Sequence, residues 1–289
     1  SGIAVTGVDD SHGAWQFSTN GGASWSAFGA VSDGAARLLG TDTNTLVRFV
    51  PLADWNGSVP NGLVFRAWDQ TSGTAGGTAD ASSNGANTAF SSATASSGIT
   101  LDAVNDAPVL VGASNLAAIA EDATGNPGTR VSALVAAQSS DVDAAALAGI
   151  AITGADSSIG RWQYSTNAGG SWQAIGPVSD GNARLLAADA NTFVRLVPNT
   201  HWNGSVAAAL SFRAWDQTTG AAGGVADATA SGATTAFSSV VASSGITVSA
   251  VNDAPTLGEA IIDQAATQGA TFSFQIPVDS FSEIDLGDT

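Results

Sequence analysis

The sequence predicts an all-β protein that consists of tandem β-sandwich domains. The first observation is an internal repeat: Gly2-Ile3-Ala4 recurs as Gly149-Ile150-Ala151, and the match continues without a gap as far as Pro108 and Pro255. Roughly two thirds of the paired positions are identical, which is typical of a chain that repeats one domain. The other two observations are a succession of short strand patterns and the near absence of helical periodicity. Several short strands per repeat indicate a sandwich or barrel rather than a parallel α/β sheet.

Two strands are predicted from the alternation of side chains. Residues 45–50 place Val47 and Phe49 on one face, and residues 63–68 alternate in the same way. Both segments are rich in β-branched and aromatic residues and lie between turns rich in Asp, Asn and Gly. A helical tendency is limited to the alanine-rich residues 143–148.

Two long segments are poor in bulky residues, namely 70–97 and its repeat 217–244. A loop of this length inside a compact domain is uncommon and is usually functional or mobile. We expect a partly ordered excursion between the last two strands of each repeat. Phe90 and Phe237 are the side chains expected to anchor these excursions to the core.

The repeat divides the chain into three predicted domains. Residues 1–108 are expected to form a domain that lacks its opening strands, because the segment 109–147 has no counterpart ahead of the first copy. Residues 109–255 are expected to form a complete domain. Residues 256–289 resemble neither copy and are expected to open a third domain. On this division we expect the sequence to be a fragment of a longer protein; the alternative is a short protein with unusual termini.

The composition of the 289 residues excludes several classes of partner. The formal net charge is -17, and all eight cationic side chains are arginine. Such a chain repels nucleic acid and anionic lipid, so neither is an expected partner. The acidity has two readings, a solvating surface or a set of ligands for a hard cation, and short Asp side chains in turns suit calcium. There are no cysteines and no apolar window long enough for a membrane span.

The segment Ser165-Thr166-Asn167-Ala168-Gly169-Gly170-Ser171-Trp172, repeated at 18–25, fits the Asp-box pattern Ser-x-Asp/Asn-x-Gly-x-x-Trp. Asn is expected to cap its own turn, Gly to take a positive φ, and Trp to fold back over the hairpin. In families that carry Asp-boxes, such as sialidases, the motif lies away from the active site. The pattern therefore favours a structural role over sugar binding.

The boundary segment Asp102-Ala103-Val104-Asn105-Asp106-Ala107-Pro108 stands where one repeat gives way to the next. Its proline stiffens the exit from a strand and cannot continue a central ladder. Three oxygen-bearing side chains lie close together in it. The segment resembles the cadherin linker, Asp-x-Asn-Asp-Asn-x-Pro, and the Asn-Asp-Ala-Pro linker of cadherin-like repeats in giant bacterial adhesins of the RTX, type I-secreted kind.

Further motifs of the cadherin-like family occur in order along the chain. They resemble the first-strand Glu, the Gly-Thr-x-Val, the Asp-x-Asp and the Ala-x-Asp-x-Gly of such repeats, and the opening of another cadherin-like domain. The corresponding segments are Ile119-Ala120-Glu121-Asp122, Gly128-Thr129-Arg130-Val131, Asp141-Val142-Asp143, Ala67-Trp68-Asp69, Ala214-Trp215-Asp216, Phe272-Ser273-Phe274 and Asp285-Leu286-Gly287-Asp288. The resemblance implies Greek-key β-sandwiches, cadherin-like or Ig-like, joined end to end.

The resemblance also implies calcium at both joints between domains. At the first joint the implied ligands are Asp102, Asn105, Asp106, Asp141, Asp143 and Asp216. At the second joint they are Glu121, Asn252, Asp253, Asp285 and Asp288. Calcium takes about six to eight oxygen ligands, and no single turn here supplies so many, so the ligands would have to converge from two domains. The alternative is that these Asp and Asn residues only cap turns.

The chain also departs from the pattern of the family. Ser249 stands where the first linker has Asp102, and His201 stands where the first copy has Asp54. The linkers lack the second Asn of the cadherin pattern. These differences leave the number of ions per joint open, and neither Asp54 nor His201 is assigned as a ligand.

Catalysis finds little support in the sequence. His12 and His201 are the two histidines, and neither recurs in the other copy. No Ser/His/Asp spacing stands out, and nothing marks a carboxylate pair for glycoside hydrolysis. We therefore expect a protein that is not an enzyme.

Tryptophan is abundant, and the eight residues pair between the copies: Trp15, Trp25, Trp55 and Trp68 with Trp162, Trp172, Trp202 and Trp215. Large core fillers are expected in domains otherwise poor in bulky residues. Trp68 and Trp215 lie on the face that carries arginine, so an exposed ring stacked on a guanidinium or on a sugar ring is the alternative for these two; packing in the core or on a cation is favoured over ligand binding.

Two functions follow from these observations. The first is structural: a calcium-stiffened extender of a long secreted adhesin of the bacterial cell surface, which projects a distal binding region for cell adhesion or biofilm formation and whose partners are its neighbouring repeats. The second is a lectin-like module that holds polysaccharide or surface glycans through exposed Trp. Ligand residues at both joints favour the first function, and an exposed Trp cluster beside Asn and Asp favours the second.

Overall fold

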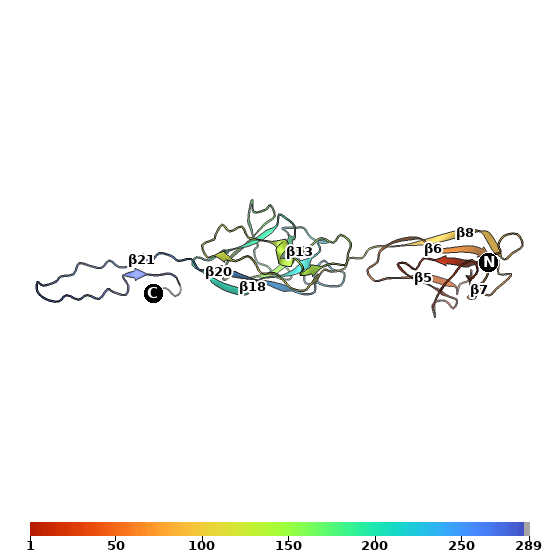
Figure 1. The fold of residues 1–289 in the computed structure, drawn as a ribbon, viewed down its shortest axis with the longest axis horizontal. Coiled ribbons are helices and arrows are strands. Elements are labelled where there is room, and N and C mark those ends of the chain that lie inside the picture. Colours follow the sequence, from red (N-terminus) through yellow and green to blue (C-terminus); the bar gives the residue numbers. More distant parts are fainter. Residues whose placement is uncertain (286–289) are drawn as a thin grey trace. The chain divides into compact units, whose positions relative to one another are not determined.

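The computed structural model describes residues 1–285. The chain divides into two compact units: unit 1 is Ser1–Val104, and unit 2 begins at Asn105. Both units consist of β-sheets, as Figure 1 shows, and the predicted all-β sandwich class is confirmed. Strand pairing in the described residues is antiparallel except for one short parallel pair in unit 2. In the described part of the chain, no helix is long and apolar enough to cross a bilayer.

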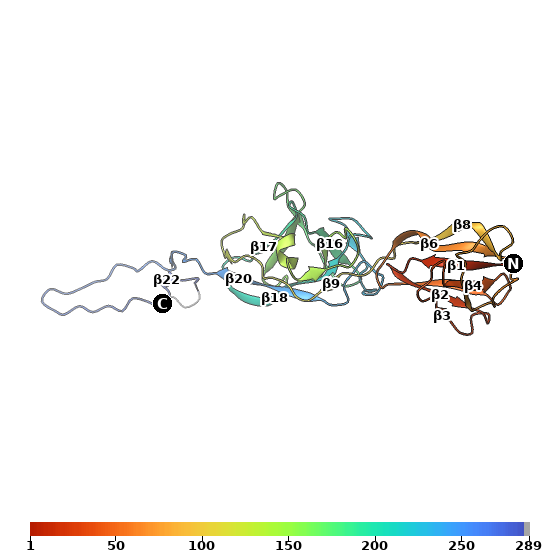
Figure 2. The same ribbon diagram turned by 45° about the vertical axis from the view of Figure 1, so that its right-hand side comes forward.

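Unit 1 packs a five-stranded sheet against a three-stranded sheet. Its strands are β1 (Gly2–Val8), β2 (Gly13–Ser18), β3 (Ser26–Ala27), β4 (Ala36–Gly40), β5 (Leu46–Pro51), β6 (Gly57–Trp68), β7 (Thr78–Ala79) and β8 (Phe90–Leu101). The strand order is β7-β4-β1-β6-β8 in one sheet and β3-β2-β5 in the other. Figure 2 shows β1 and β4 side by side, with β2 and β3 next to them. Strands β5 and β6 confirm the two segments predicted from alternation.

Alternation along the strands buries both faces of the five-stranded sheet. The core between the two sheets consists of Val5, Trp15, Phe17, Phe28, Leu39 and Leu63. The other face turns Ala4 and Leu38 toward a second cluster with Trp68, Ala81 and Phe90. Ala81 and Phe90 come from the segment that links β6 to β8. The long excursion is thus a cover for the outer face of the sheet, and Phe90, buried at 6% exposure, anchors it as predicted.

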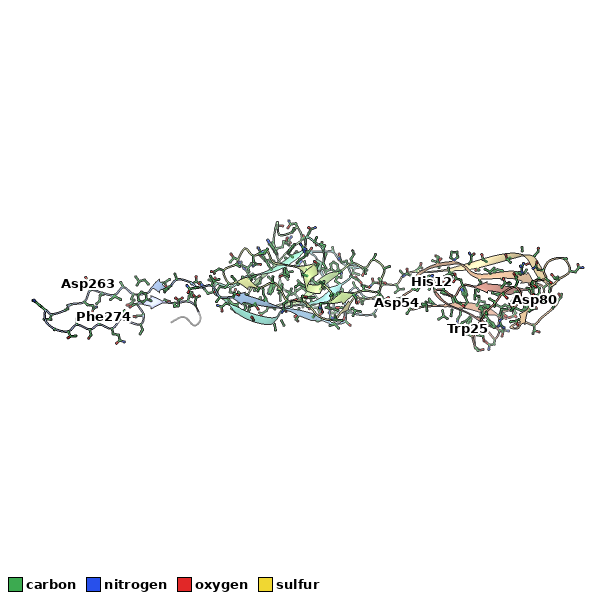
Figure 3. All side chains as sticks on the ribbon, in the orientation of Figure 1. His12, Trp25, Asp54, Asp80, Asp263 and Phe274 are labelled. Atoms are coloured by element: carbon green, nitrogen blue, oxygen red, sulfur yellow. The ribbon has the colours of Figure 1, made fainter. Side chains whose placement is uncertain are left out.

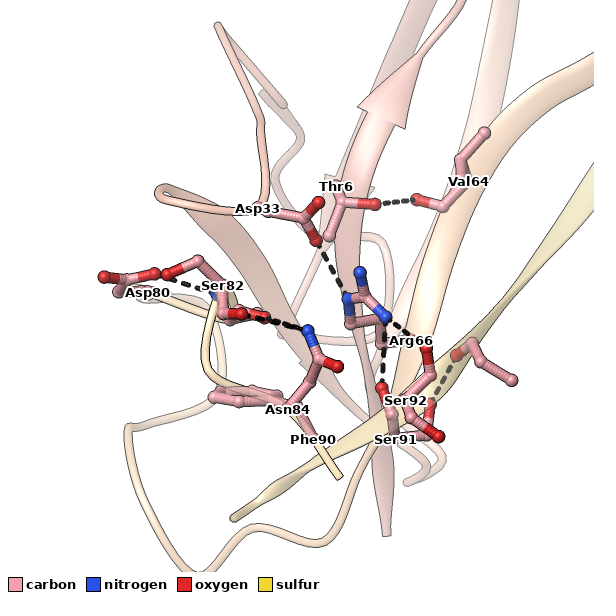
Figure 4. Close-up of polar contacts among 12 residues, drawn as sticks. Thr6, Asp33, Val64, Arg66, Asp80, Ser82, Asn84, Phe90, Ser91 and Ser92 are labelled. Atoms are coloured by element: carbon pink, nitrogen blue, oxygen red, sulfur yellow. Dashed lines mark hydrogen bonds and ion pairs between the residues drawn. The ribbon is translucent and has the colours of Figure 1, made fainter. Parts of the chain in front are cut away.

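Arg66 fastens this cover to the sheet (Figure 4). Its Nε donates to Oδ1 of Asp33 over 2.9 Å, and its Nη1 donates to the carbonyl oxygens of Ser91 and Ser92 over 3.2 and 2.8 Å. The backbone of Asp33 in turn accepts a 2.6 Å hydrogen bond from the nitrogen of Ala81. One guanidinium therefore links the turn before β4 to the beginning of β8.

Unit 2 repeats the eight strands of unit 1 and adds an opening segment. The repeated strands are β13 (Gly149–Ala155), β14 (Gly160–Ser165), β15 (Gln173–Ala174), β16 (Ala183–Ala187), β17 (Phe193–Pro198), β18 (Gly204–Trp215), β19 (Val225–Ala226) and β20 (Ala242–Ser249). Even the bulge is shared, because the register shifts between Val5 and Gly7 in unit 1 and between Ile152 and Gly154 in unit 2. Phe237 has the same anchoring place over Trp215 as Phe90 has over Trp68.

The opening segment of unit 2 contains β9 (Val109–Leu110), β10 (Ile119–Ala120), β11 (Thr129–Arg130), α1 (Val131–Val135) and β12 (Ser139–Ser140). Strand β10 pairs in parallel with β20, and β11 extends the second sheet at β17. Leu116, Val131 and Leu134 are buried in the main core. The segment therefore closes one side of the sandwich.

Two local expectations are wrong. Residues 143–148 are turn and irregular chain, and in the described residues the one α-helix is α1, because Ala145 takes a left-handed φ of 63° that ends any helix there. The predicted excursion 70–97 is also shorter than expected, since β8 begins at Phe90 and pairs Thr94 with Arg66. Small Ser, Ala and Thr side chains form a strand here. Backbone hydrogen bonds to β6 and the bonds from Arg66 to Ser91 and Ser92 hold this segment against the sheet.

The described residues that follow Pro255 form a long loop that is closed by two short paired strands. Strand β21 (Thr256–Leu257) pairs with β22 (Phe281–Ser282). Many apolar side chains of the loop between them are exposed, including Val278 at 96% and Ile262 at 77%. The loop between the two strands holds Asp263 and Phe274, which are labelled in Figure 3.

Candidate metal sites at the boundary segments

The first boundary segment contacts the rest of unit 2 through hydrogen bonds among Asp and Asn residues. Nδ2 of Asn105 donates to Oδ2 of Asp216 over 2.9 Å, and the backbone nitrogen of Asp106 donates to Oδ2 of Asp143 over 2.8 Å. The backbone nitrogen of Asp143 donates to Oδ1 of Asp141 over 3.0 Å. We call these five residues the first-boundary cluster. The structure thus brings together five of the six predicted ligands of the first joint.

Burial makes the first-boundary cluster electrostatically unusual. Asp216 is only 3% exposed, and Oδ2 of Asp141 is buried without a hydrogen-bond partner. The ion pairs of the described residues are Arg66–Asp33, Arg213–Asp180 and His201–Asp253, so no arginine neutralises Asp141, Asp143 or Asp216. A carboxylate oxygen removed from water without a partner costs free energy. A cation at this place would remove that cost.

The sixth predicted ligand, Asp102, belongs to unit 1. It is exposed and directly follows β8. Asp69, the counterpart of Asp216 in unit 1, is exposed as well, and its carboxylate accepts hydrogen bonds from the nitrogen and hydroxyl of Thr71. Those bonds, the hydroxyl first, hold the pKa of Asp69 below its usual value.

The second boundary repeats the central contact of the first. The backbone nitrogen of Asp253 donates to Oδ2 of Asp285 over 2.7 Å, and Oδ1 of Asp285 is buried without a partner. Oε1 of Glu283 accepts from the nitrogens of Ile284 and Asp285 over 2.7 and 3.2 Å. Glu283-Ile284-Asp285 therefore corresponds to Asp141-Val142-Asp143. Glu283 was not among the predicted ligands, and its place two residues before Asp285 is the signal that could have found it.

Two of the other predicted ligands of the second joint, Glu121 and Asn252, take no part in the contact between Asp253 and Asp285. Glu121 is 2% exposed; its Oε1 accepts from the nitrogen of Val251 over 2.6 Å, and its Oε2 accepts from Nδ2 of Asn203 over 3.1 Å. The resemblance placed Glu121 at this joint, and the structure brings it to the boundary segment. Asn252 is exposed, and its Nδ2 donates to the carbonyl oxygen of Asp253. Asp288 lies outside the described residues.

His201 takes part in the second boundary as the partner of Asp253. Its Nδ1 lies 2.7 Å from Oδ2 of Asp253, and both side chains are about one-third exposed. His201 has a left-handed φ of 57°, as its counterpart Asp54 has at 58°. The backbone at this position is therefore repeated, while the side chain changes from a carboxylate to an imidazole.

No three His, Cys, Asp or Glu side chains in the part of the chain that the structure describes converge closely enough to hold a metal by themselves. Calcium, however, also takes amide oxygens, backbone carbonyls and water. Asn105 uses Nδ2 as a donor to Asp216, so its Oδ1 is the atom that it can offer to an ion. The donor set at each boundary fits a hard cation that is completed by such neutral oxygens.

The Asp-box turns have the predicted local geometry in both copies. Oδ1 of Asn167 accepts from the nitrogen of Ser171 over 2.9 Å, and Oγ of Ser165 accepts from the nitrogen of Gly169 over 2.9 Å. Gly169 has a φ of 85°, and Gly22 has a φ of 87° at the matching position. The side chains of Ser165, Asn167 and Ser171 thus hydrogen-bond within the turn, which is the local geometry predicted for it.

Trp68 and Trp215 pack in the core, as favoured from the sequence, and the alternative in which they are exposed is wrong. They are 2% and 1% exposed, and each Nε1 donates to a carbonyl oxygen four residues on, at Ser72 and Thr219, over 2.8 Å. Trp68 and Trp215 are core residues because the 70–89 and 217–236 segments cover them. They cannot stack on a sugar ring.

Cation–π stacking occurs at the Asp-box tryptophans instead. Arg48 lies 4.2 Å from the ring centroid of Trp25, which is labelled in Figure 3, and Arg195 lies 4.0 Å from that of Trp172. Trp55 is stacked on His12 with 4.5 Å between centroids. The partly exposed indole rings of these residues are therefore already in contact with cationic or aromatic side chains of the chain.

No protein family, curated protein or solved structure matches the chain. The geometry of the two boundaries is therefore the basis for assigning a function.

Proposed function

We propose that the chain is an extender of a long, secreted adhesin-like protein of the bacterial surface, in which calcium stiffens the boundaries between repeated domains. Repetition would supply reach, so that a distal region can mediate cell adhesion or biofilm formation. The observation that carries the proposal is the buried, unpartnered carboxylate oxygen at each boundary, Oδ2 of Asp141 and Oδ1 of Asp285. Each lies beside the contact of a boundary segment: Asp285 itself accepts from the nitrogen of Asp253, and Asp141 accepts from the nitrogen of Asp143, which in turn accepts from that of Asp106.

Asp141, Asp143 and Asp216, with Oδ1 of Asn105, would hold an ion at the first boundary. The ion would neutralise carboxylates that burial has separated from water, and it would fix the segment that passes between the repeats. Without the ion, the like charges repel one another and weaken the attachment of that segment. Stiffness of the boundary would then depend on calcium.

The acidic composition supports a location outside the cell. Calcium sites of extracellular modules bind with dissociation constants of about 10⁻⁴–10⁻³ M, which suits calcium in the surrounding medium. The ligand sets here are small, with neutral oxygens beside two or three carboxylates, and such sets favour the weak end of the range. The formal net charge of -17 also keeps a long array soluble by mutual repulsion.

The test is thermal unfolding and small-angle scattering of the whole chain after chelation and after addition of about 1–10 mM calcium. The expected result is a higher melting temperature and a narrower distribution of maximum dimensions with calcium. Magnesium at the same concentration is the control for ionic strength. The calcium proposal is excluded if neither quantity responds to calcium, or if magnesium has the same effect.

Two variants connect the response to the boundaries. Asp143→Asn and Asp285→Asn together should abolish the calcium-dependent rise in melting temperature. Asp189→Asn is the matched control, because Asp189 is exposed and its carboxylate accepts only from the nitrogen of Asn191 in its own turn. A calcium response that persists in the double variant would place the ion elsewhere.

A further inference from the structure

Unit 2 has a surface groove of about 500 Å³ that contains no residue of either boundary segment. Four segments line it: the turn after β13, the beginning of β14, the chain at and after β15, and the turn after β17. The side chains that give the groove its chemistry are those of Ser157, Arg161, Trp162, Pro177, Val178 and Asn199. We call this space the Arg161 groove. Sites for small ligands have volumes of about 300–1,000 Å³, so the groove is large enough for one.

Arg161 differs from the other arginines of the chain. In the described residues, each of the other seven has a hydrogen bond, an ion pair or a ring contact, whereas the exposed Arg161 has none. Asp156, the acidic residue closest to it in the sequence, instead holds its own turn, because its Oδ1 accepts from the nitrogen and the hydroxyl of Ser158. A free guanidinium presents a planar fork of N–H donors that fits a carboxylate.

Two neutral polar side chains lie around the same groove. Nδ2 of Asn199 donates to the carbonyl oxygen of Ser158 over 2.7 Å, so its Oδ1 is the atom left to accept from a ligand hydroxyl. The hydroxyl of Ser157 is exposed, has no partner among the described residues, and can donate or accept. These groups and Arg161 come from three separate segments. A compact ligand with several polar groups reaches all three, whereas an extended peptide is bound through a row of backbone groups.

The rest of the groove is apolar and rigid. Trp162 is only 5% exposed, and its Nε1 donates to the carbonyl oxygen of Asp156 over 2.8 Å, which fixes the indole ring. Pro177 and Val178 add aliphatic surface beside it. The C–H groups of a sugar ring pack on such a surface while its hydroxyl groups bind the polar side chains.

Unit 1 has the same framework without this set of polar groups. Strand β2 pairs with β5 as β14 pairs with β17, and Trp15 corresponds to Trp162. The counterparts of Ser157, Arg161, Pro177 and Asn199 are Asp10, Ala14, Ala30 and Leu52. The first repeat therefore has a carboxylate and no cation at this place, so the ability to hold an anion is specific to the second repeat.

We propose that the Arg161 groove binds a sugar residue that carries a carboxylate, as in the uronic acid units of an acidic polysaccharide. Arg161 binds the carboxylate, Ser157 and Asn199 bind hydroxyl groups, and the ring packs against Trp162. The net charge of -17 does not prevent binding, because charges more than about 8 Å away are largely screened at physiological ionic strength. The site requires no calcium and is independent of the extender function.

The test is titration of the whole ¹⁵N-labelled chain with a trisaccharide of D-galacturonic acid, followed by NMR of the indole N–H signals and by calorimetry. Divalent cations are left out, since they bind carboxylate sugars themselves. The expected result is one saturable site per chain and a shift of the Trp162 signal. The methyl-esterified trisaccharide, which has the same ring hydroxyl groups and no charge, should bind about tenfold more weakly or worse.

Arg161→Gln connects binding to the groove and should weaken it about tenfold or more. The melting temperature of this variant should not change, because the side chain makes no contact within the described residues, so a loss of binding is not a loss of folding. Arg48→Gln is the matched control, because it removes one charge from an exposed arginine in unit 1 and should leave binding unchanged.

Equal binding of the acid and its methyl ester would overturn the proposal, as would full binding by Arg161→Gln. A peptide of three glutamates that binds as tightly as the trisaccharide would also overturn it, because the partner would then be an acidic peptide. The calcium response of the boundaries is measured separately, so failure of the Arg161 groove leaves the extender proposal standing.

Discussion

Asp143 donates its backbone N–H to Oδ1 of Asp141 over 3.0 Å, while Oδ2 of the same Asp141 is buried without a hydrogen-bond partner. One oxygen of Asp141 therefore holds the local turn, and the other is free for a ligand. Glu283 and Asp285 repeat the first half of this relationship over 3.2 Å at the second boundary. A substitution at Asp141 can remove the charge while keeping the oxygen that holds the turn.

Asp141→Asn keeps an acceptor for the nitrogen of Asp143 and removes the negative charge. Without calcium, the variant should be as stable as the parent chain or more stable by about 1 kcal/mol, because repulsion from Asp143 is relieved. With calcium it should lose most of the gain in stability. Calorimetric melting with and without calcium measures both effects. A variant that is destabilised without calcium and keeps the full calcium response would contradict the assignment of Asp141 as a ligand.

Arg213 and Asp180 form an ion pair of 3.1 Å, but the pair is not the main contribution of the arginine. Asp180 is 48% exposed, so solvent screens the pair and Asp180→Asn should cost no more than about 1 kcal/mol. Nη1 of Arg213 also donates to the carbonyl oxygens of Ser238 and Ser239 over 3.0 and 2.8 Å. Arg213→Met should cost about 2–3 kcal/mol, because it removes charge-assisted bonds that hold the cover.

Urea unfolding measures the loss of stability in each of the two variants. The single variants Asp33→Asn and Arg66→Met allow the same comparison in unit 1. Equal losses from the aspartate and the arginine variants would show that the ion pair dominates.

The repeat and the alternation of side chains were sufficient to predict the sandwich and strands β5 and β6. They left Trp68 open between the core and the surface, because the side of an isolated strand that carries Arg66 is expected to face solvent. That side is covered by a segment that returns from far along the chain and contributes Ala81 and Phe90. Such a cover is a tertiary effect, which a periodicity of two cannot reveal.

In the candidate site, too, some residues could be predicted from local sequence and others could not. Short motifs were enough to select Asn105, Asp106 and Asp143, because a linker motif and an Asp-x-Asp motif depend on local sequence. Glu283 was missed, because Glu in place of Asp breaks the motif while its carboxylate still reaches the nitrogen of Asp285. The partner of Asp253 was missed as well, since His201 comes from a turn far away in the sequence.

The stability of the exposed aspartate turns should fall in acid. The hydroxyl of Thr229, followed by its backbone nitrogen, lowers the pKa of Asp227, and Ser158 does the same for Asp156. A carboxyl whose folded pKa is depressed stabilises the fold above its unfolded pKa, near 3.9, and loses this contribution as the pH falls through the folded pKa. The loss should therefore occur below about pH 4.

Thr229→Val tests this dependence, because it removes the hydroxyl and leaves the shape of the side chain. The variant should be less stable at neutral pH, and its melting temperature should decline less steeply between about pH 4 and pH 2. Melting curves across that range measure the slope. An unchanged slope would show that the hydroxyl does not perturb the carboxyl.

Asn167 determines the shape of the Asp-box turn and, through it, the position of Trp172. Its Oδ1 accepts from the nitrogen of Ser171, and its Nδ2 donates to Oγ of Ser171 over 3.0 Å. Asn167→Ala should cost about 1–2 kcal/mol, because an Asn that caps its own turn contributes about as much as a helix cap. Asn167→Asp should cost less, since the acceptor remains. Thr166→Ala, at an exposed position of the same turn, should change stability by no more than about 0.5 kcal/mol.

The readout is urea unfolding together with the near-ultraviolet dichroism of Trp172, which reports its stack on Arg195. If Asn167→Ala leaves both the stability and the tryptophan signal unchanged, then the stack holds the turn rather than the reverse.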